Sequence, residues 1–245
     1  MKNQSHSQKV ALVFGGSRGI GAAAAKRLAQ DGFAVALTYI SSPDKAGQVV
    51  EEITAAGGQA FAIAADSASA EALQRAVALT VERFGPLDAA VVNAGIIRVA
   101  PLSSFSLDDL DAMLDVNIRG VFLAIQAATA QMNDGGRVIT MGSNTAVRSF
   151  IGAAAVYAMT KAAVAGLVKG LALDLAPRRI TVNNVQPGPT ETDITADMVE
   201  RLAASSPLQR IAQPEEIASL VSWLAGSESG YMTGSSLTID GGLTA

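Results

Sequence analysis

The sequence contains no cysteine, and its only histidine is His6, close to the amino terminus. The absence of cysteine excludes disulfide bonds, thiolate catalysis and cysteine-based zinc sites. No second type of metal ligand clusters near His6, so we expect no metal site. Charged residues are also sparse, at 16% of 245 residues, and 18 basic against 22 acidic side chains give a net charge of −4. Nucleic acids and anionic membranes require a concentrated positive field, and we expect neither as a partner.

Long hydrophobic runs are absent too, although 49% of the residues are hydrophobic. No apolar run reaches the roughly 18 residues that span a bilayer, because Lys161 and Lys169 interrupt the richest stretch. The first nine residues are polar and lack the apolar segment of a signal peptide. We therefore expect a flexible tail over residues 1–8 and a cytoplasmic protein with a large core.

Short apolar runs alternate with longer helical patterns along the whole chain. The short runs are evenly apolar and mostly bounded by Gly, Pro, Asn or Asp, which is typical of buried parallel strands. The expected strands are Val10–Phe14, Ala34–Tyr39, Ala60–Ala65, Ala89–Val92, Val138–Met141, Thr181–Val185 and Leu237–Asp240. The expected helices are about Gly19–Gln30, Asp44–Ala56, Ala70–Phe84, Asp108–Met132, Tyr157–Leu175 and Pro214–Ala225.

This alternation predicts an α/β fold with a single Rossmann-type, doubly wound domain over residues 9–245, in which a seven-stranded parallel sheet is flanked by helices. In such sheets, ligands bind at the carboxyl ends of the strands where the winding direction reverses. We therefore expect the functional residues directly after the strands.

A glycine-rich loop follows the first expected strand and precedes an alanine-rich helix. Gly15 allows the tight turn out of the strand, Gly19 lets backbone N–H groups approach a pyrophosphate, and Gly21 lets the helix pack close to the sheet. This order of strand, loop and helix indicates a dinucleotide-binding site rather than a simple turn. The cofactor contacts expected here are Gly15, Ser17, Arg18, Gly19, Ile20 and Gly21.

The end of the second strand carries no acidic residue that would bind the ribose 2′-hydroxyl of NAD. The first acid, Asp44, belongs to a helix start. Arg18 can neutralise a 2′-phosphate, so the sequence favours NADP(H) over NAD, although Arg18 is also compatible with a solvated surface arginine. The residues expected near this ribose are Tyr39, Ser41 and Ser42.

Polar and small residues follow the third and fourth strands. Asp66 is placed to accept a hydrogen bond from the adenine amino group, and Ser67 follows it. Asn93, Ala94 and Gly95 allow close approach of the backbone to the adenosine. Each of these is compatible with plain turn chemistry, but their common location at strand ends favours cofactor binding.

A tyrosine and a lysine lie four residues apart at the start of the fifth expected helix, so Tyr157 and Lys161 project from one face. An adjacent ammonium lowers the pKa of a phenol, which makes Tyr157 a candidate general acid for carbonyl reduction and general base for alcohol oxidation. Ser143, just after the fifth strand, can donate to the substrate oxygen. Asn117 lies inside a long helical pattern where asparagine is unfavourable, which suggests a local disruption that holds a water molecule.

The combination resembles a classical short-chain dehydrogenase/reductase over essentially the whole chain. The resemblance is carried by GGSRGIG at 15–21, NAG at 93–95, Asn117, Ser143, YAMTK at 157–161 and NNVQPGPTETD at 183–193. It implies hydride transfer involving the nicotinamide, with Ser143 polarising the carbonyl, Tyr157 transferring the proton, Lys161 binding the nicotinamide ribose and Asn117 completing a water relay. It also implies nicotinamide contacts from Pro187, Gly188, Thr190 and Thr192, and a mobile helix near Ile194–Ala204 within a substrate segment at about 189–212.

Two positions depart from the family pattern. Phe14 stands where the family usually has Thr, and Val92 stands where it usually has Asn. The family's hydrogen bonds to the first turn and to the adenosine edge are therefore not expected from these two residues.

Within the family the chain resembles 3-oxoacyl-[acyl-carrier-protein] reductases, but it has few basic residues to attract an acidic carrier, so a small ketone or secondary alcohol is the expected substrate. Arg98, Arg148 and Phe150 are candidates to line its pocket. The resemblance also implies a homotetramer, or a dimer.

The alternative is a regulator on the same fold. The segments Val91–Gly95, Val185–Pro189 and Gln213–Glu216 also resemble the biofilm-dispersal mediators of this family, which are described as binding cyclic di-GMP. A pure binding protein has no need of the four residues Asn117, Ser143, Tyr157 and Lys161 together, and the sequence shows no paired arginines suited to two guanines and two phosphates.

Overall fold

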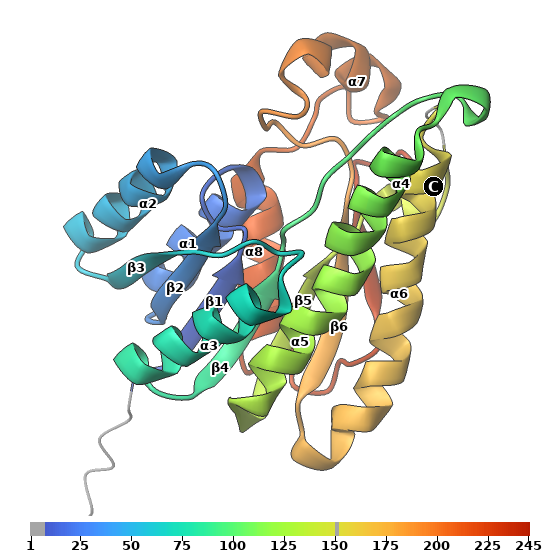
Figure 1. Ribbon diagram of the computed structural model, residues 1–245. Coiled ribbons are helices and arrows are strands. Elements are labelled where there is room, and N and C mark those ends of the chain that lie inside the picture. Colours follow the sequence, from blue (N-terminus) through green and yellow to red (C-terminus); the bar gives the residue numbers. More distant parts are fainter. Residues whose placement is uncertain (1–7, 150–151) are drawn as a thin grey trace, which may run out of the picture.

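The computed structural model describes residues 8–149 and 152–245. Seven parallel strands form one sheet in the order β3-β2-β1-β4-β5-β6-β7 (Figure 1). This arrangement confirms the predicted doubly wound α/β fold. The strands are β1 (Val10–Phe14), β2 (Ala34–Tyr39), β3 (Gln59–Ala64), β4 (Leu87–Val92), β5 (Met132–Met141), β6 (Thr181–Pro187) and β7 (Ser236–Ile239).

Both faces of the sheet are covered by helices, because the central strands are apolar on both sides. In β1, Ala11 and Val13 belong to one core cluster and Leu12 and Phe14 to the other, and all four are fully buried. The first cluster is closed by α1 (Gly19–Gln30), α2 (Pro43–Ala55) and α8 (Pro214–Ala225). The second is closed by α3 (Ala70–Phe84), α5 (Val121–Ala130) and α6 (Ala155–Leu175), as Figure 1 shows.

The winding direction reverses between β1 and β4, which are neighbours in the sheet although β2 and β3 separate them in the chain. The carboxyl ends of the parallel strands lie at one edge of the sheet, so the loops after β1, β4, β5 and β6 converge there. The fold thereby brings together the glycine loop, the segment after β4, Ser143 and the segment after β6.

The predicted single helix over Asp108–Met132 is wrong. The chain instead forms α4 (Leu107–Leu114), a π-helical turn η2 (Asp115–Gly120), α5 and then β5, which starts at Met132. A Cβ at Gly120 would lie 2.3 Å from the carbonyl oxygen of Ser67, so the wide turn lets the backbone pack against the segment after β3. The local disruption that the sequence predicts at Asn117 is present, because Asn117 lies inside this π-turn.

Within the described part of the chain, one helix, Ala155–Arg178, is long and apolar enough to cross a membrane by length and composition alone. Its stripe of Val164, Val168 and Ala172 is buried, and α6 packs along β6. The helix is thus a structural layer of the sheet domain, and its composition is no argument for a membrane span.

The segment after β6 rises above the carboxyl edge of the sheet (Figure 1). It contains a short 3₁₀ turn, η5 (Ala196–Met198), and α7 (Val199–Ser205), where the sequence predicts a helix near Ile194–Ala204. Only Leu202 of α7 is buried. The helix α7 therefore contacts the core through one buried side chain.

Candidate active site

The glycine loop lies tightly between β1 and the segment after β4. Gly15 has a φ of +76°, and a Cβ at this position would lie 2.9 Å from the Cα of Ala94. Gly21 is equally constrained, since its Cβ would lie 2.1 Å from the carbonyl oxygen of Gly15. Only glycine fits at these two positions, as the sequence predicts.

The amino terminus of α1 is open to an anion. Arg18 is its N-cap residue, has an extended backbone and provides no side-chain cap, and the first turn has no acidic residue. The first N–H groups of a helix without such a cap are ready to bind a phosphate. Gly19, with a φ of +53°, follows directly, and a Cβ there would lie 3.0 Å from Cγ2 of Thr192. The chain therefore offers a fitting cradle for the pyrophosphate of a dinucleotide, between the glycine loop and the segment after β6.

Other residues replace the hydrogen bonds that Phe14 and Val92 cannot make. The hydroxyl of Thr38 in β2 accepts a hydrogen bond from the Gly15 N–H at 2.9 Å, and the Thr38 carbonyl accepts one from Gly16. The Asn93 side chain donates to the Gly15 carbonyl at 2.7 Å. The first turn is braced from both neighbouring strands despite the two departures.

The residues expected around the adenosine lie at the ends of β2 and β3. Tyr39 ends β2 and is partly buried, whereas Ser41 is exposed and Ser42 is the N-cap of α2. The Asp66 carboxylate accepts a hydrogen bond from the N–H of Ala68 and is exposed, while Ser67 is buried. All five lie along the same edge of the sheet as the glycine loop.

Lys161 is buried beneath the carboxyl end of β5. Its Nζ donates to the carbonyl oxygen of Met141 at 2.9 Å and lies 5.7 Å from the centre of the Tyr157 ring. Burial lowers the pKa of Lys161 from 10.5 to about 8, because the charged ammonium loses its hydration. The ammonium and the phenol therefore share one face of α6, as their spacing predicts.

The electrostatics of Tyr157 differ from the expectation. Burial raises the pKa of its hydroxyl above the usual value of 10, and a hydrogen bond with Ser143 opposes part of that rise. The expected lowering by Lys161 is not among the causes of this shift, so that expectation is wrong. Tyr157 is consequently a protonated donor at neutral pH.

Ser143 is held by a neighbour that the sequence analysis did not single out. The hydroxyl of Thr145 donates to Ser143 Oγ at 2.9 Å, and the N–H of Thr145 donates to the same oxygen at 3.2 Å. Both residues are buried. Because Ser143 Oγ already accepts two hydrogen bonds, its own proton is directed to a third partner.

Asn117 is fully buried and clamps the segment after β4. Its Oδ1 accepts from the Ile96 N–H at 2.9 Å, and its Nδ2 donates to the Ile96 carbonyl at 2.8 Å and to Thr160 Oγ1 at 3.2 Å. Thr160 in turn donates to the carbonyl of Tyr157 at 2.8 Å. The π-turn is thus connected through hydrogen bonds to the backbone of the tyrosine.

Gly95 packs closely against two of the predicted catalytic residues. A Cβ at this position would lie 3.3 Å from Oδ1 of Asn117 and 3.4 Å from Nζ of Lys161. Both contacts are tight, so the absence of a side chain at Gly95 lets the segment after β4 pack directly against Asn117 and Lys161.

The segment expected to contact the nicotinamide is fixed at its start. The Gly188 N–H donates to the Ile239 carbonyl. A Cβ at Gly188 would lie 2.6 Å from the Cβ of Asp240. Asp240 also accepts from the Asn144 side chain, next to Ser143. Thr190 and Thr192 follow, with Thr190 buried.

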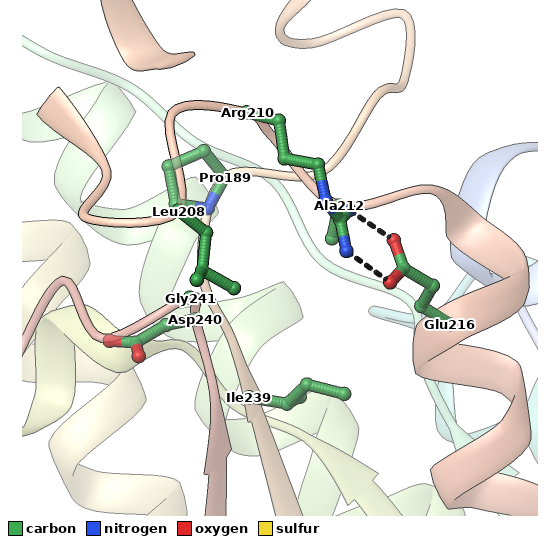
Figure 2. Close-up of a pocket in the computed structure, with 8 residues that line it drawn as sticks. All are labelled: Pro189, Leu208, Arg210, Ala212, Glu216, Ile239, Asp240 and Gly241. Atoms are coloured by element: carbon green, nitrogen blue, oxygen red, sulfur yellow. Dashed lines mark hydrogen bonds and ion pairs between the residues drawn. The ribbon is translucent and has the colours of Figure 1, made fainter. Parts of the chain in front are cut away.

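The far end of the same segment is anchored to α8. Figure 2 shows Arg210 paired with Glu216 at the wall of a hollow, through two hydrogen bonds of 2.6 and 2.7 Å. This pairing, together with the Gln213 N–H, holds the pKa of Glu216 at about 2. The hollow, which contains none of the predicted catalytic residues, is lined by Pro189, Leu208, Arg210, Ala212, Glu216, Ile239, Asp240 and Gly241.

Sequence reasoning missed Thr38, Thr145, Thr160 and Asp240. Thr38 and Asp240 bond to partners that the fold brings close, whereas Thr145 and Thr160 bond to Ser143 and Tyr157, two and three residues away. Thr145 and Asp240 follow the ends of strands, and this position could have identified them as candidate site residues. Phe150, a candidate pocket residue, lies outside the described residues, and Arg98 forms an ion pair with Asp109 at 3.3 Å.

Known proteins share this arrangement of strands and loops. Residues 15–244 match the family model described as enoyl-(acyl carrier protein) reductase. A short-chain dehydrogenase/reductase from Serratia marcescens is 54% identical, with a TM-score of 0.94 over 97% of this chain and 98% of that one. A short-chain dehydrogenase from Burkholderia cenocepacia, solved in complex with NADP, is 46% identical, with a TM-score of 0.93 over 98% of this chain and all of that one.

Two curated relatives carry different functional names. The cyclic-di-GMP-binding biofilm dispersal mediator protein of Escherichia coli is 40% identical over 97% of this chain and 98% of its own. The 3-oxoacyl-[acyl-carrier-protein] reductase FabG of Staphylococcus aureus is 41% identical over 96% of this chain and 98% of its own. Since the family model and these relatives span nearly the whole chain, the protein belongs to the short-chain dehydrogenase/reductase family of oxidoreductases.

Proposed function

We propose that the protein is an NADPH-dependent carbonyl reductase, acting in reverse as an alcohol dehydrogenase on a small ketone or secondary alcohol. The observation that carries the proposal is the convergence of Ser143, Tyr157 and Lys161 at the end of β5, beside Gly95 and the Asn117 clamp. Such a group of donors next to a dinucleotide cradle fits proton transfer coupled to hydride transfer.

Each polar side chain has a distinct task in this proposal. NADPH, when bound, supplies the hydride that reaches the carbonyl carbon. Ser143 donates a hydrogen bond to the carbonyl oxygen, and the two hydrogen bonds from Thr145 direct its proton there. Tyr157 then gives its proton to the same oxygen, which becomes the alcohol hydroxyl.

Tyr157 regains its proton through Lys161 and Asn117, on the side of the site away from the substrate. Lys161 Nζ is fixed by Met141 at 5.7 Å from the centre of the Tyr157 ring, and its positive charge would face the phenolate that forms when Tyr157 gives up its proton. A water molecule that bridges Lys161 and Asn117, as the family resemblance implies, would connect this ammonium to solvent. In alcohol oxidation the same residues act in the opposite direction.

The preference for NADPH is supported by the end of β2 and by a relative. β2 ends at Tyr39 without an acid that would repel a 2′-phosphate, and Arg18 lies at the start of α1. The related Burkholderia cenocepacia dehydrogenase was solved with NADP. The proposed contacts to the rest of the cofactor are those predicted from the sequence.

The substrate class and assembly belong to the same proposal. Val99, Val147 and Ile194, from three loops at the carboxyl edge, are more than half exposed, which favours an apolar substrate bound under the segment at about 189–212. Gly166 and Gly170 on α6 face open space in the single chain, which supports a homotetramer, or a dimer, built across this helix. A cytoplasmic location is part of the proposal.

The deciding experiment measures NADPH consumption by the purified protein with a panel of ketones, diketones, 3-oxoesters and sugars. Tyr157→Phe is assayed in parallel and its NADPH binding is measured by calorimetry. Turnover that disappears in the variant while NADPH still binds supports the reductase. Unchanged turnover in Tyr157→Phe would refute the assigned mechanism.

A second candidate function is cyclic di-GMP binding, which the name of the Escherichia coli relative suggests. A fluorescent cyclic dinucleotide that binds below micromolar concentration, in a protein that turns over no carbonyl, would favour this regulator over the reductase. Retention of the four predicted catalytic residues supports the enzyme as the first choice.

A further inference from the structure

Two cations from different elements share one carboxylate near the dinucleotide cradle. Oδ2 of Asp193 lies 2.7 Å from Nζ of Lys45 and 3.4 Å from Nη1 of Arg18. Arg18 belongs to the start of α1, Lys45 to the first turn of α2, and Asp193 to the segment after β6. All three side chains are about half exposed, so these groups can exchange partners with a dissolved anion.

The position of this cluster matches one end of the proposed cofactor. In dinucleotide folds the group on the ribose 2′ position is read at the end of the second strand. α2 begins at Pro43, four residues after β2 ends at Tyr39, and Lys45 is in its first turn. Arg18 and Lys45 both reach a single oxygen there, so they can also reach the oxygens of one phosphate.

The carboxylate is delivered by the segment that also contacts the glycine loop. Thr192, next to Asp193, packs on Gly19, and the Thr192 N–H donates to Thr195 Oγ1 at 3.0 Å. The Thr195 hydroxyl also donates to the carbonyl of Thr190 at 2.6 Å. These contacts hold the start of the segment in a compact turn that presents Asp193 to the two cations.

We propose that Lys45 and Arg18 together form the site that selects the 2′-phosphate of NADPH, and that the Asp193 carboxylate competes with this phosphate for both cations. The inference rests on the proposed function and adds to it two residues, Lys45 and Asp193, that the sequence analysis did not assign. A phosphate monoester carries more negative charge than a carboxylate and three acceptor oxygens, so it displaces Asp193. NADH has no group that gains from this displacement.

The first test is Asp193→Asn, which removes the competing charge and leaves the turn intact. Calorimetric titration with NADPH is expected to show about three- to tenfold tighter binding than in the wild type, with NADH affinity changed less than about twofold. Asp197→Asn is the matched control, because Asp197 is exposed on the same segment and the substitution changes the net charge equally. An equal gain in both variants would reduce the effect to overall charge and overturn the proposal.

The second test is Lys45→Gln, expected to weaken NADPH binding about tenfold without changing NADH binding. Lys26→Gln on α1 is its control, since Lys26 pairs with Glu52 instead. In the Lys45→Gln background, Asp193→Asn is expected to gain less than it does alone, because one of the shared cations is missing. Additive effects of the two substitutions would contradict competition for a common site.

The outcomes separate this inference from the proposed function. Wild-type protein that binds NADPH much more tightly than NADH, with a Lys45→Gln variant that does the same, would overturn only the assignment of Lys45. Wild-type protein that binds neither nucleotide, or both equally, would overturn the proposed cofactor itself.

Discussion

The two halves of the site are built differently. The half formed by the loops after β1 and β2 presents backbone N–H groups and the exposed cations Arg18 and Lys45. The half formed by β5, η2 and α6 presents buried side chains, and among them Asn117 and Lys161 are almost inaccessible to solvent. In the first half, single charges can change at little cost to the fold. In the second half, function and stability share the same hydrogen bonds.

The largest effect is expected where the buried half carries out the reaction. Tyr157→Phe is expected to lower kcat by about a thousandfold or more, because the proton donor is lost while the ring that packs in the site is retained. Tyr231→Phe, at a fully exposed tyrosine, is the control and is expected to keep wild-type rates. Steady-state NADPH oxidation measures both. A Tyr157→Phe variant with a tenth of the wild-type rate would mean that another group donates the proton.

Asn117→Leu tests whether the buried half also supports the fold. It leaves the N–H and carbonyl of Ile96 without their partners, and we expect a loss of about 3 kcal/mol in the free energy of unfolding, as well as loss of activity. Chemical denaturation measures the loss. Gln48→Leu is the control, at an exposed position of α2. A loss below about 0.5 kcal/mol would remove the contrast between the two halves.

Lys161→Met is expected to raise the free energy of unfolding, unlike Asn117→Leu, because a buried ammonium destabilises the folded state. A pKa lowered from 10.5 to about 8 corresponds to roughly 3 kcal/mol of destabilisation at pH 7. The variant regains this free energy but leaves the Met141 carbonyl without its donor, at a cost of about 1 kcal/mol. The variant is therefore expected to be inactive and about 2 kcal/mol more stable.

The pH dependence of stability provides a second test of the buried ammonium. The folded state binds fewer protons than the unfolded state between pH 8 and 10.5, so wild-type stability rises through this window relative to that of Lys161→Met. Denaturant midpoints at pH 7 and pH 10 measure the difference. A constant gap between the two proteins would show that Lys161 is not a destabilised cation.

The smallest predicted effect concerns Thr145, which orients Ser143. Thr145→Val keeps the shape but removes the hydroxyl, and it is expected to lower kcat about tenfold with little change in KM. Thr145→Ser restores the donor and should recover most of the rate. If the two variants are equally slow, restoring the hydroxyl does not restore the rate, and the orienting role of the Thr145 hydroxyl is refuted.

The sequence predicted features that depend on local spacing. The seven strands, the glycine loop and the shared face of Tyr157 and Lys161 all follow from neighbours in the chain, and the structure has them. Thr38 and Asp193 were not predicted, because their partners lie 23 and at least 148 residues away in the chain. Periodicity also joined α4 to α5, since the π-turn interrupts hydrogen bonding without interrupting the apolar pattern.

The clamp between Asn117 and Ile96 has a consequence for how this chain can diversify. The side-chain amide of Asn117 bonds to both the N–H and the carbonyl of Ile96, as the peptide group of a neighbouring strand would. The amide therefore replaces the hydrogen bonds of a neighbouring strand at a point beyond the end of β4. Beyond Ile96, the loop at 97–106 can change in length and sequence without moving Gly95 or the buried residues beside it. The side-chain amide of Asn117 therefore separates the buried residues, which the reaction requires, from the loop at 97–106, which can change to fit a new substrate.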